Sequence, residues 1–469
     1  MKSILIVGSG LSAWATCVSI LESNQKNYSL SFIDPSVRFE SVEKATIHTP
    51  ISKNLLGSNH MYAKPDSHLE FDGITNLSYA KGGLSNVWGA GIRLWSFDKV
   101  AKMVSDQEGF YASASNLLQK MGYIGDSEKL NLGGFIPPVS GPMAAGRLSS
   151  QVKTITSGKV QVFQTPLSVK TSGQNMCRSC GSCLSGCPYG AIFNSGDQFD
   201  LLVSQGKISR MEGKVLNLSS IGDKIVVIYD DKNNQKEAAF DTVYLCAGAV
   251  GTPAILLRSS LITSNVRIRD SQVFYFGGFY KRKSKAEGAF ALSQLTIFEE
   301  DRYSCSLYES SHETRMRVSN RFKFLGKFLK LPKILDSYMF FGIGFLPSEK
   351  SGHIVISKGD LSPNSLKLEY SRNHQTPRAV KDARKSISKI LRDSKFYTFP
   401  FTFFPKKPGS GFHSGGGLSL GGELVDNFGS LRVHKNIKIS DASILPDLHA
   451  GPHTLTTMTI NHLLAQKSS

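Results

Sequence analysis

The first forty residues alternate between short apolar runs and a glycine-rich turn. Residues 3–7 form a continuous apolar run that predicts a buried strand, and residues 8–13 then read G-S-G-L-S-A before a helical stretch to about Leu21. A second predicted strand, residues 30–33, ends at Asp34. Strand, glycine turn, helix, strand and acidic residue in this order are the pattern of a dinucleotide-binding βαβ unit.

The glycine turn suits a bound pyrophosphate. Gly8 and Gly10 permit a tight turn and a close backbone approach, with Ala13 at the third small position. The N-terminus of the predicted helix supplies N–H donors and the positive end of its dipole. Asp34 is placed to accept hydrogen bonds from the ribose hydroxyls of an adenosine.

Further along the chain, the pattern changes to short strands. Residues 224–229 and 238–245 alternate or run apolar, and the polar turn 230–234 between them predicts a hairpin. The apolar run 243–249 then leads into a helix with Pro253 near its first turn. From about 265 to 408 the pattern alternates and is rich in aromatic residues, which predicts a separate sheet-based domain.

The C-terminal part combines glycine-rich loops, a strand over 437–440 and a terminal helix from about Thr454. With 469 residues the chain exceeds one compact core, so we expect roughly two or three domains. Hydrophobic residues make up 40% and charged residues 20%, which excludes a disordered chain. No apolar run approaches the roughly 18 residues of a spanning helix, and Gly8 interrupts the N-terminal run, so we expect a cytoplasmic protein.

The charge is unusual. The chain holds 55 Lys and Arg against 37 Asp and Glu, a surplus of 18 that predicts an anionic partner: nucleic acid, a phosphorylated substrate or acidic lipid. Residues 281–285 and 315–335 carry much of it, and in the second stretch Lys323, Lys327 and Lys330 lie beside an apolar face. A basic helix of this kind, with the aromatic run 397–407, is typical of a membrane surface, although a solvated rim over a core gives the same pattern. No nucleic-acid-binding motif accompanies the charge, which disfavours nucleic acid.

The seven cysteines are unevenly spaced. Cys17, Cys246 and Cys305 are scattered, whereas the other four lie within eleven residues: Cys177, Cys180, Cys183 and Cys187. An odd total and tight clustering fit metal or redox chemistry better than an extracellular disulfide framework.

The run C-x-x-C-x-x-C-x-x-x-C-P reproduces the bacterial ferredoxin spacing for a [4Fe–4S] cluster. In two-cluster ferredoxins the fourth cysteine serves the other cluster, so the fourth ligand here is either Cys187 or a distant thiol such as Cys305. A zinc site with four thiolates and a structural loop without metal are the alternatives that the spacing leaves open.

Three further segments complete a pattern begun by the N-terminal turn. Residues 81–89 read K-G-G-L-S-N-V-W-G, and residues 246–253 read C-A-G-A-V-G-T-P. The stretch from His413 to Met458 contains H-S-G-G-G, V-D-N-F-G, D-A-S-I-L-P and G-P-H-T in that order. Together the four segments resemble the glucose–methanol–choline (GMC) family of FAD-dependent oxidoreductases, most closely its pyranose and fructose oxidoreductase branches.

The resemblance implies FAD, a hydride taken from an alcohol or sugar carbinol, and a histidine pair above the flavin. It places the pair on His413, as the base that removes the hydroxyl proton, and His453, as its partner; His449 is the alternative if the register is shifted. A neutral imidazole within hydrogen-bond reach accepts such a proton near pH 7. The implied cofactor-binding residues are Gly8, Gly10, Ala13, Asp34, Gly82, Gly83, Ser85, Asn86, Ala247, Gly248, Asp441, Ala442 and Thr454.

Two positions depart from the family pattern. Some pyranose-oxidising relatives carry a flavin-linking histidine just before the loop tryptophan, where this chain has Val87, so we predict non-covalent FAD. Pro452 precedes His453, whereas many relatives have Asn and then Pro.

The predicted fold is α/β: a Rossmann-like FAD-binding domain over 1–264 and 409–469, with a cysteine-rich insertion at about 170–195, and a sheet-based substrate domain over 265–408. The predicted function is a dehydrogenase that oxidises a sugar or other alcohol. The positive charge of the chain favours a substrate that carries a phosphate or a lipid. Its electrons would leave through an iron–sulfur cluster to an acceptor protein or quinone. The alternatives are a redox-neutral flavoprotein acting on a sugar or nucleotide-sugar, and a non-catalytic electron-transfer or membrane-associated module. The membrane reading of the charge places the cytoplasmic protein peripherally on the inner face of the membrane.

Overall fold

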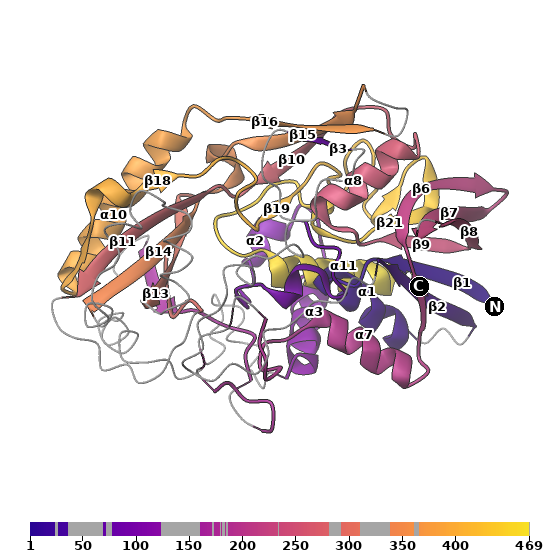
Figure 1. Ribbon diagram of the computed structural model, residues 1–469, viewed down its shortest axis with the longest axis horizontal. Coiled ribbons are helices and arrows are strands. Elements are labelled where there is room, and N and C mark those ends of the chain that lie inside the picture. The colour runs from indigo at the N-terminus through magenta and orange to yellow at the C-terminus, as the bar shows by residue number, and fades with distance from the viewer. Residues whose placement is uncertain are drawn as a thin grey trace.

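The computed structural model of the protein describes residues 1–23, 27–35, 69–71, 77–122, 160–170, 173–178, 180, 183, 186–232, 234–280, 292–309, 338–360 and 365–468. The basic stretches 281–285 and 315–335 therefore lie outside the described residues. Both chain termini lie at the same end of the molecule, and the helix over Thr376–Asp393 lies at the opposite end (Figure 1).

A six-stranded sheet holds the N-terminal βαβ unit. Strand β1 is central and pairs in parallel with β2 on one side and β9 on the other. The order is β20-β21-β9-β1-β2-β5, with bounds β20 Ser430–Leu431, β21 His434–Ile439, β9 Thr242–Leu245, β1 Lys2–Val7, β2 Tyr28–Asp34 and β5 Ser209–Glu212. The apolar run predicted for residues 3–7 is thus a buried parallel strand, in which Leu5 and Ile6 are completely buried.

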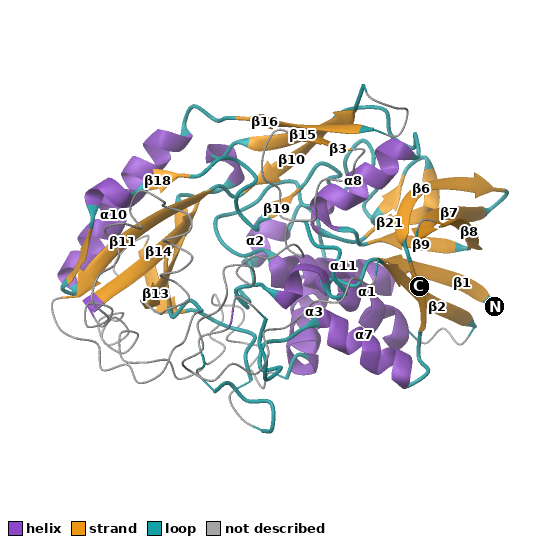
Figure 2. Cartoon of the chain, viewed as in Figure 1, coloured by secondary structure: helices purple, strands orange, loops and turns teal. Residues whose placement is uncertain are grey.

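Helices cover this sheet. On one side gather α1 Leu11–Glu22, α3 Gln107–Lys120, α7 Ser195–Ser204 and α11 Thr454–Ser468 (Figure 2). Helix α8 (Gly248–Arg258) follows β9 and contains Pro253 in its second turn. The terminal helix predicted from about Thr454 is confirmed, and α11 packs against both α1 and α3.

The predicted strand over 238–245 is divided in two. Strand β8 (Asn234–Phe240) belongs to a three-stranded meander with β6 (Lys214–Ile221) and β7 (Lys224–Asp231), whereas β9 joins the six-stranded sheet. The break falls at Asp241, whose carboxylate accepts hydrogen bonds from the backbone N–H of Ser3 at 2.7 Å and from its hydroxyl at 2.6 Å. This contact fixes the start of β9 beside β1, so the chain changes sheets there.

Two further sheets follow. A five-stranded sheet has the order β19-β10-β15-β16-β3, with bounds β19 Ser414–Gly415, β10 Val266–Asp270, β15 His353–Lys358, β16 Leu366–Ser371 and β3 Leu69–Phe71. A seven-stranded sheet has the order β17-β11-β14-β13-β12-β4, with β18 also on β11; its bounds are β17 Phe396–Thr398, β11 Val273–Tyr280, β14 Met339–Phe345, β13 Tyr303–Glu309, β12 Leu295–Glu299, β4 Val160–Gln164 and β18 Phe404–Pro405.

One large core joins the six-stranded and five-stranded sheets, since Ile268 of β10 and Ile354 of β15 pack with the residues of β1 and α8. A second core lies between the seven-stranded sheet and helix α10 (Thr376–Asp393). In α10 the buried Val380, Ala383 and Ile387 recur at helical spacing, which gives the helix one apolar face. The proposed division at residues 264 and 408 remains a prediction. In the described part of the chain no helix has the length and apolar character needed to span a membrane.

Candidate functional site

The turn between β1 and α1 has the geometry that a bound anion requires. Gly8 has φ +110°, and a Cβ there would lie 2.6 Å from the carbonyl oxygen of Cys246, so only glycine fits. Gly10 is the N-cap of α1, and a Cβ added to it would meet nothing within 4 Å. Among the described residues, the N-terminus of α1 therefore borders open space at Gly10, which is what a pyrophosphate needs to approach the backbone.

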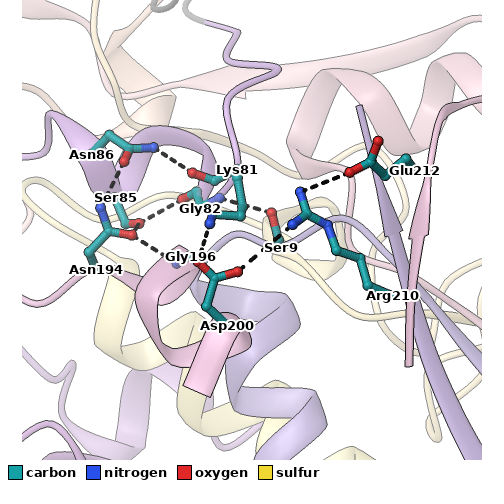
Figure 3. Close-up of polar contacts among 10 residues, drawn as sticks. All are labelled: Ser9, Lys81, Gly82, Ser85, Asn86, Asn194, Gly196, Asp200, Arg210 and Glu212. Carbon is teal, nitrogen blue, oxygen red and sulfur yellow. Dashed lines mark hydrogen bonds and ion pairs between the residues drawn. The ribbon is translucent and has the colours of Figure 1, made fainter. Parts of the chain in front are cut away.

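The second glycine loop lies directly against this turn. Gly82 has φ +85°, and its N–H donates to the hydroxyl of Ser9 at 2.9 Å (Figure 3). A Cβ on Gly83 would lie 3.6 Å from the Cα of Gly10. The structure thus brings together two glycine-rich segments that are more than seventy residues apart in the sequence.

Ser85 and Asn86 hold the second loop in shape. The Ser85 hydroxyl donates to the carbonyl of Gly82 at 2.6 Å, and the Asn86 amide donates to the carbonyls of Lys81 and Gly83 at 2.8 Å each. These side chains organise the loop from within, so their predicted contact with the cofactor stays a prediction.

Asn194 and Ser195, which the sequence interpretation missed, connect the two loops. Asn194 caps α7 through Gly196 N–H at 2.8 Å and donates to Asn86 Oδ1 at 2.7 Å (Figure 3). The Ser195 hydroxyl donates to the carbonyl of Ser9 at 2.8 Å and lies 3.1 Å from that of Ser85. An N-cap asparagine ahead of a helix is visible in the sequence, but Asn86, the partner of Asn194, is 108 residues away, and Ser9, the partner of Ser195, is 186 residues away. The sequence signal therefore identified a helix start only.

Ion pairs at the other end of this assembly tie α7 to the sheet edge. Asp200 of α7 pairs with Lys81 and lies 3.9 Å from Arg210 of β5, which in turn lies 3.7 Å from Glu212 (Figure 3). These side chains are partly exposed, so the pairs contribute little stability each. They connect α7, whose N-terminus holds Asn194 and Ser195, to the second glycine loop and to β5.

Asp34 and Asp441 are both buried acids, in different settings. Asp34 ends β2 and is 3% exposed. Asp441 accepts hydrogen bonds from Gly248 N–H at 2.8 Å, from the hydroxyl of Thr252, and from Ser443 N–H at 2.9 Å. Burial raises the pKa of Asp441, and these donors oppose that rise. Asp441 therefore holds the turn over 441–443 against the N-terminus of α8, next to Ala247 and Ala442.

The structure brings His413 and His453 together. Their ring centroids are 5.7 Å apart at an angle of 72°. Burial, and secondarily the neighbouring His453, lowers the pKa of His413 to about 3, and burial lowers the pKa of His453 to about 4. Both imidazoles are therefore neutral at pH 7, the state in which a histidine accepts a proton.

Neighbouring residues contact each histidine and fix its position. The ring of Phe345 stacks on His413 with centroids 4.4 Å apart, and the His413 carbonyl accepts a hydrogen bond from Ser271 N–H at 2.9 Å. His453 Nδ1 lies 3.0 Å from the hydroxyl of Thr457, which donates to the His453 carbonyl at 3.0 Å. Because that hydroxyl proton is used on the carbonyl, the ring contact is best made by Nδ1–H, and Nε2 of His453 is then the unprotonated nitrogen.

The neighbouring segment links the pair to the second glycine loop. A Cβ on Gly91 would lie 3.5 Å from Pro452, and Trp95 N–H donates to the Thr456 hydroxyl at 2.9 Å. His449, the alternative partner, lies elsewhere: its ring contacts Trp95 edge-on at 4.7 Å, and its Nδ1 is 4.0 Å from Asp301. The structure therefore pairs His413 with His453 and not with His449.

The four clustered cysteines line one small cavity, together with Val169, Arg178, Tyr189, Ala191, Ile192 and Leu292. Backbone N–H of Ala191 points to the sulfur of Cys187 at 3.3 Å. Cys305 is fully buried in the second core, on β13, so the fourth cysteine at this cavity is Cys187.

No disulfide joins any of the seven cysteines, all of which are described. Across the described ranges, no three or more His, Cys, Asp or Glu side chains are arranged as ligands of a metal ion. The cavity is close to the glycine loops, since Trp88 packs against both the large core and the small cluster that contains Cys183, and Trp88 Nε1 donates to the carbonyl of Phe193 at 3.0 Å.

Comparison with known proteins adds one fold relationship. No family model matches the chain, and no curated protein matches it in sequence. Its structure is similar to the crystal structure of pyridoxine 4-oxidase from Mesorbium loti, with a TM-score of 0.66 over 100% of this chain and 99% of that chain. The two sequences are 14% identical, so the likeness concerns the fold. The predicted fold class, a Rossmann-like α/β part joined to a sheet-based second part, is confirmed.

Proposed function

We propose that this protein is an FAD-dependent oxidoreductase of the GMC type that oxidises a carbinol to a carbonyl. The observation that carries the proposal is the His413–His453 pair, two neutral imidazoles 5.7 Å apart, of which His453 is buried and His413 partly buried, beside a segment that continues from the second glycine loop. The full-length fold likeness to an enzyme described as pyridoxine 4-oxidase supports the same class of reaction.

The residues present fit FAD. The open N-terminus of α1 at Gly10 would receive the pyrophosphate, and Asp34 at the end of β2 would face the adenosine ribose. The loop held by Asn194 and Ser195 would support the flavin ring. Bound FAD would supply the acceptor for the hydride that leaves the carbinol carbon, and Val87 in place of histidine supports a non-covalent cofactor.

The histidines would handle the hydroxyl proton. A carbinol that loses a hydride must also lose its O–H proton, and a neutral imidazole at hydrogen-bond distance is a suitable acceptor. The Thr457 contact leaves Nε2 of His453 as the acceptor nitrogen. We therefore assign proton removal to His453 and orientation of the carbinol oxygen to His413, the reverse of the roles expected from the family pattern.

A second proposal concerns the cysteine cavity. We propose that it holds an iron–sulfur cluster, because four thiols at ferredoxin spacing line one cavity and an amide N–H points to the Cys187 sulfur. Arg178 at the same cavity offsets part of the thiolate charge. Trp88, which follows the second glycine loop, packs against the small cluster that contains Cys183, and this suits an electron-accepting group near a flavin and favours a dehydrogenase over an oxidase.

Purified protein tests both parts. Extraction with acid should release FAD in a 1:1 ratio to protein, and a panel of alcohols and sugars should then be oxidised with a one-electron dye as acceptor. Release of no flavin, or isomerisation of a substrate without net flavin reduction, would contradict the oxidoreductase. Anaerobic iron, sulfide and zinc analysis tests the cluster separately: iron with sulfide supports it, and zinc or no metal contradicts it. Cys187→Ser should lower the iron content, whereas Cys305→Ser, outside the cavity, should leave it unchanged.

A further inference from the structure

An apolar strip runs along one face of the seven-stranded sheet. On β11 and β14, Phe274, Phe276 and Phe340 point toward α10 and form the second core. Because side chains alternate along a strand, their neighbours lie on the opposite face. We call these the apolar strip: Phe345, Ile343, Phe341 and Met339 of β14 with Tyr275 and Phe279 of β11.

The pairing register makes the strip continuous. Tyr275 lies opposite Ile343, and Phe279 lies opposite Met339. Gly277, between them and opposite Phe341, has no side chain, and the ring of Phe399 lies against it: a Cβ on Gly277 would be 3.6 Å from Phe399 Cδ2. Met339, Phe341 and Ile343 are each partly exposed, whereas the residues between them on β14 are buried.

The inner end of the strip is at the histidine pair. Phe345 is its last residue, and its ring stacks on His413 at 4.4 Å. The outer end is a group of stacked aromatic rings: Phe279 lies 5.2 Å from Tyr397 and 5.7 Å from Phe399, and Phe399 lies 5.8 Å from Phe401. Phe279 is 40% exposed and Phe401 is 76% exposed, so this end reaches solvent.

The strip is long compared with a simple alcohol. From Phe345 to Met339 it spans six residue steps of about 3.4 Å, or roughly 20 Å. A strip of this length matches an extended alkyl chain on the order of a dozen carbons or more. Partly exposed apolar side chains that begin at a candidate catalytic residue and end at exposed rings are typical of a binding surface.

We propose that the apolar strip binds a long alkyl or polyprenyl-like chain of the substrate, with the reacting carbinol at His413 and His453 and the chain extending to Phe279 and Phe401. This inference rests on the proposed function, because it places the reacting end at the histidine pair. It identifies the substrate class as a lipid-like alcohol.

Chain length provides the direct test. Displacement of a fluorescent dodecyl probe from wild-type protein by even-numbered alcohols from hexanol to hexadecanol measures binding without turnover. Each added pair of methylenes should tighten binding several-fold, since a buried methylene is worth about two- to fourfold in affinity. Affinity that is flat across the series, or no displacement by any alcohol, would overturn the proposal.

Variants locate the chain on the strip. Phe279→Asp and Phe401→Asp should each lower the hexadecanol-to-hexanol affinity ratio about fivefold or more, because a carboxylate would contact the chain. Phe428→Asp is the matched control: Phe428 is 58% exposed and lies outside the seven-stranded sheet. Equal ratios in all three variants would overturn the placement, and melting temperatures confirm that each variant is folded. A protein that binds long alcohols in this order and oxidises none of them would refute the proposed function alone.

Discussion

The hydroxyl of Thr457 lies 3.0 Å from Nδ1 of His453 and donates to the carbonyl of the same histidine. One turn of α11 thus sets which nitrogen of the imidazole carries its proton. The free nitrogen, Nε2, is the one available for catalysis, so a residue that need not touch substrate would decide the protonation pattern of the pair.

Replacing Thr457 by Val removes this hydroxyl at nearly constant volume. We expect kcat to fall about tenfold, less than the 10²- to 10⁴-fold loss typical of removing a general base. Thr457→Ser, which keeps the hydroxyl, should restore most of the rate, and His453→Asn should show the full loss. If the Val variant matched the Ser variant in kcat and pH profile, the hydroxyl would have no part in setting the tautomer.

The pH dependence of activity should reflect buried histidines. Burial lowers the pKa of His453 to about 4 and that of His413 to about 3, so both stay neutral well below the ordinary histidine value of 6.5. We therefore expect kcat/KM to remain level between pH 7 and pH 5. An acidic limb with an apparent pKa between 6 and 7 would show that the reacting histidine is solvated in the free enzyme.

Asp270 should make the free energy of unfolding fall as pH rises. Its side chain is completely buried, one oxygen accepts Gly409 N–H at 2.8 Å, and burial raises its pKa to about 7. Between about pH 4 and pH 7 the folded state therefore binds a proton that the unfolded state has released, so this contribution to stability is lost as pH rises through 7.

Asp270→Asn keeps the acceptor oxygen and cannot ionise. Relative to wild type, the variant should gain roughly 2–4 kcal/mol of unfolding free energy at pH 8.5, and much less at pH 5. Urea denaturation at the two pH values measures the difference. A gain of the same size at both pH values would mean that ionisation of Asp270 is not its cause.

Asn194 should be needed to keep the cofactor. Its amide joins the second glycine loop to the N-terminus of α7, and Asn194→Ala removes both contacts. Two hydrogen bonds of about 1 kcal/mol each predict FAD binding at least tenfold weaker, measured by flavin fluorescence. Asn436→Ala is the control, because that amide bonds the carbonyl of Asp223 at the surface. FAD retention equal to the control's would contradict the role assigned to Asn194.

The local parts of this site could be predicted because their signals are local. A β1–α1 turn needs glycine at Gly8 for steric reasons, since Cys246 leaves no room for a Cβ, and the sequence shows that glycine between an apolar run and a helix. The four cysteines were also recognisable, because one short segment supplies them all.

Contacts between distant segments could not be predicted in this way. Asn194 reads as a helix cap, and nothing in its neighbourhood indicates that Asn86 lies 2.7 Å away. Pairing of His413 with His453 rather than His449 depends on where α11 begins, and the apolar strip exists only through the register of β11 against β14. Alternating aromatic residues predicted a sheet, but which face meets α10 is decided by packing.

Anaerobic mixing of purified FAD-loaded protein with a long-chain alcohol, followed by absorbance, tests the central claim most directly. We predict that the visible absorption of oxidised flavin is lost in a single turnover, with one carbonyl product formed per flavin, and that His453→Asn slows this step at least 10²-fold. Flavin that stays oxidised with every alcohol and sugar offered, or a His453→Asn variant that is reduced at the wild-type rate, would contradict the account.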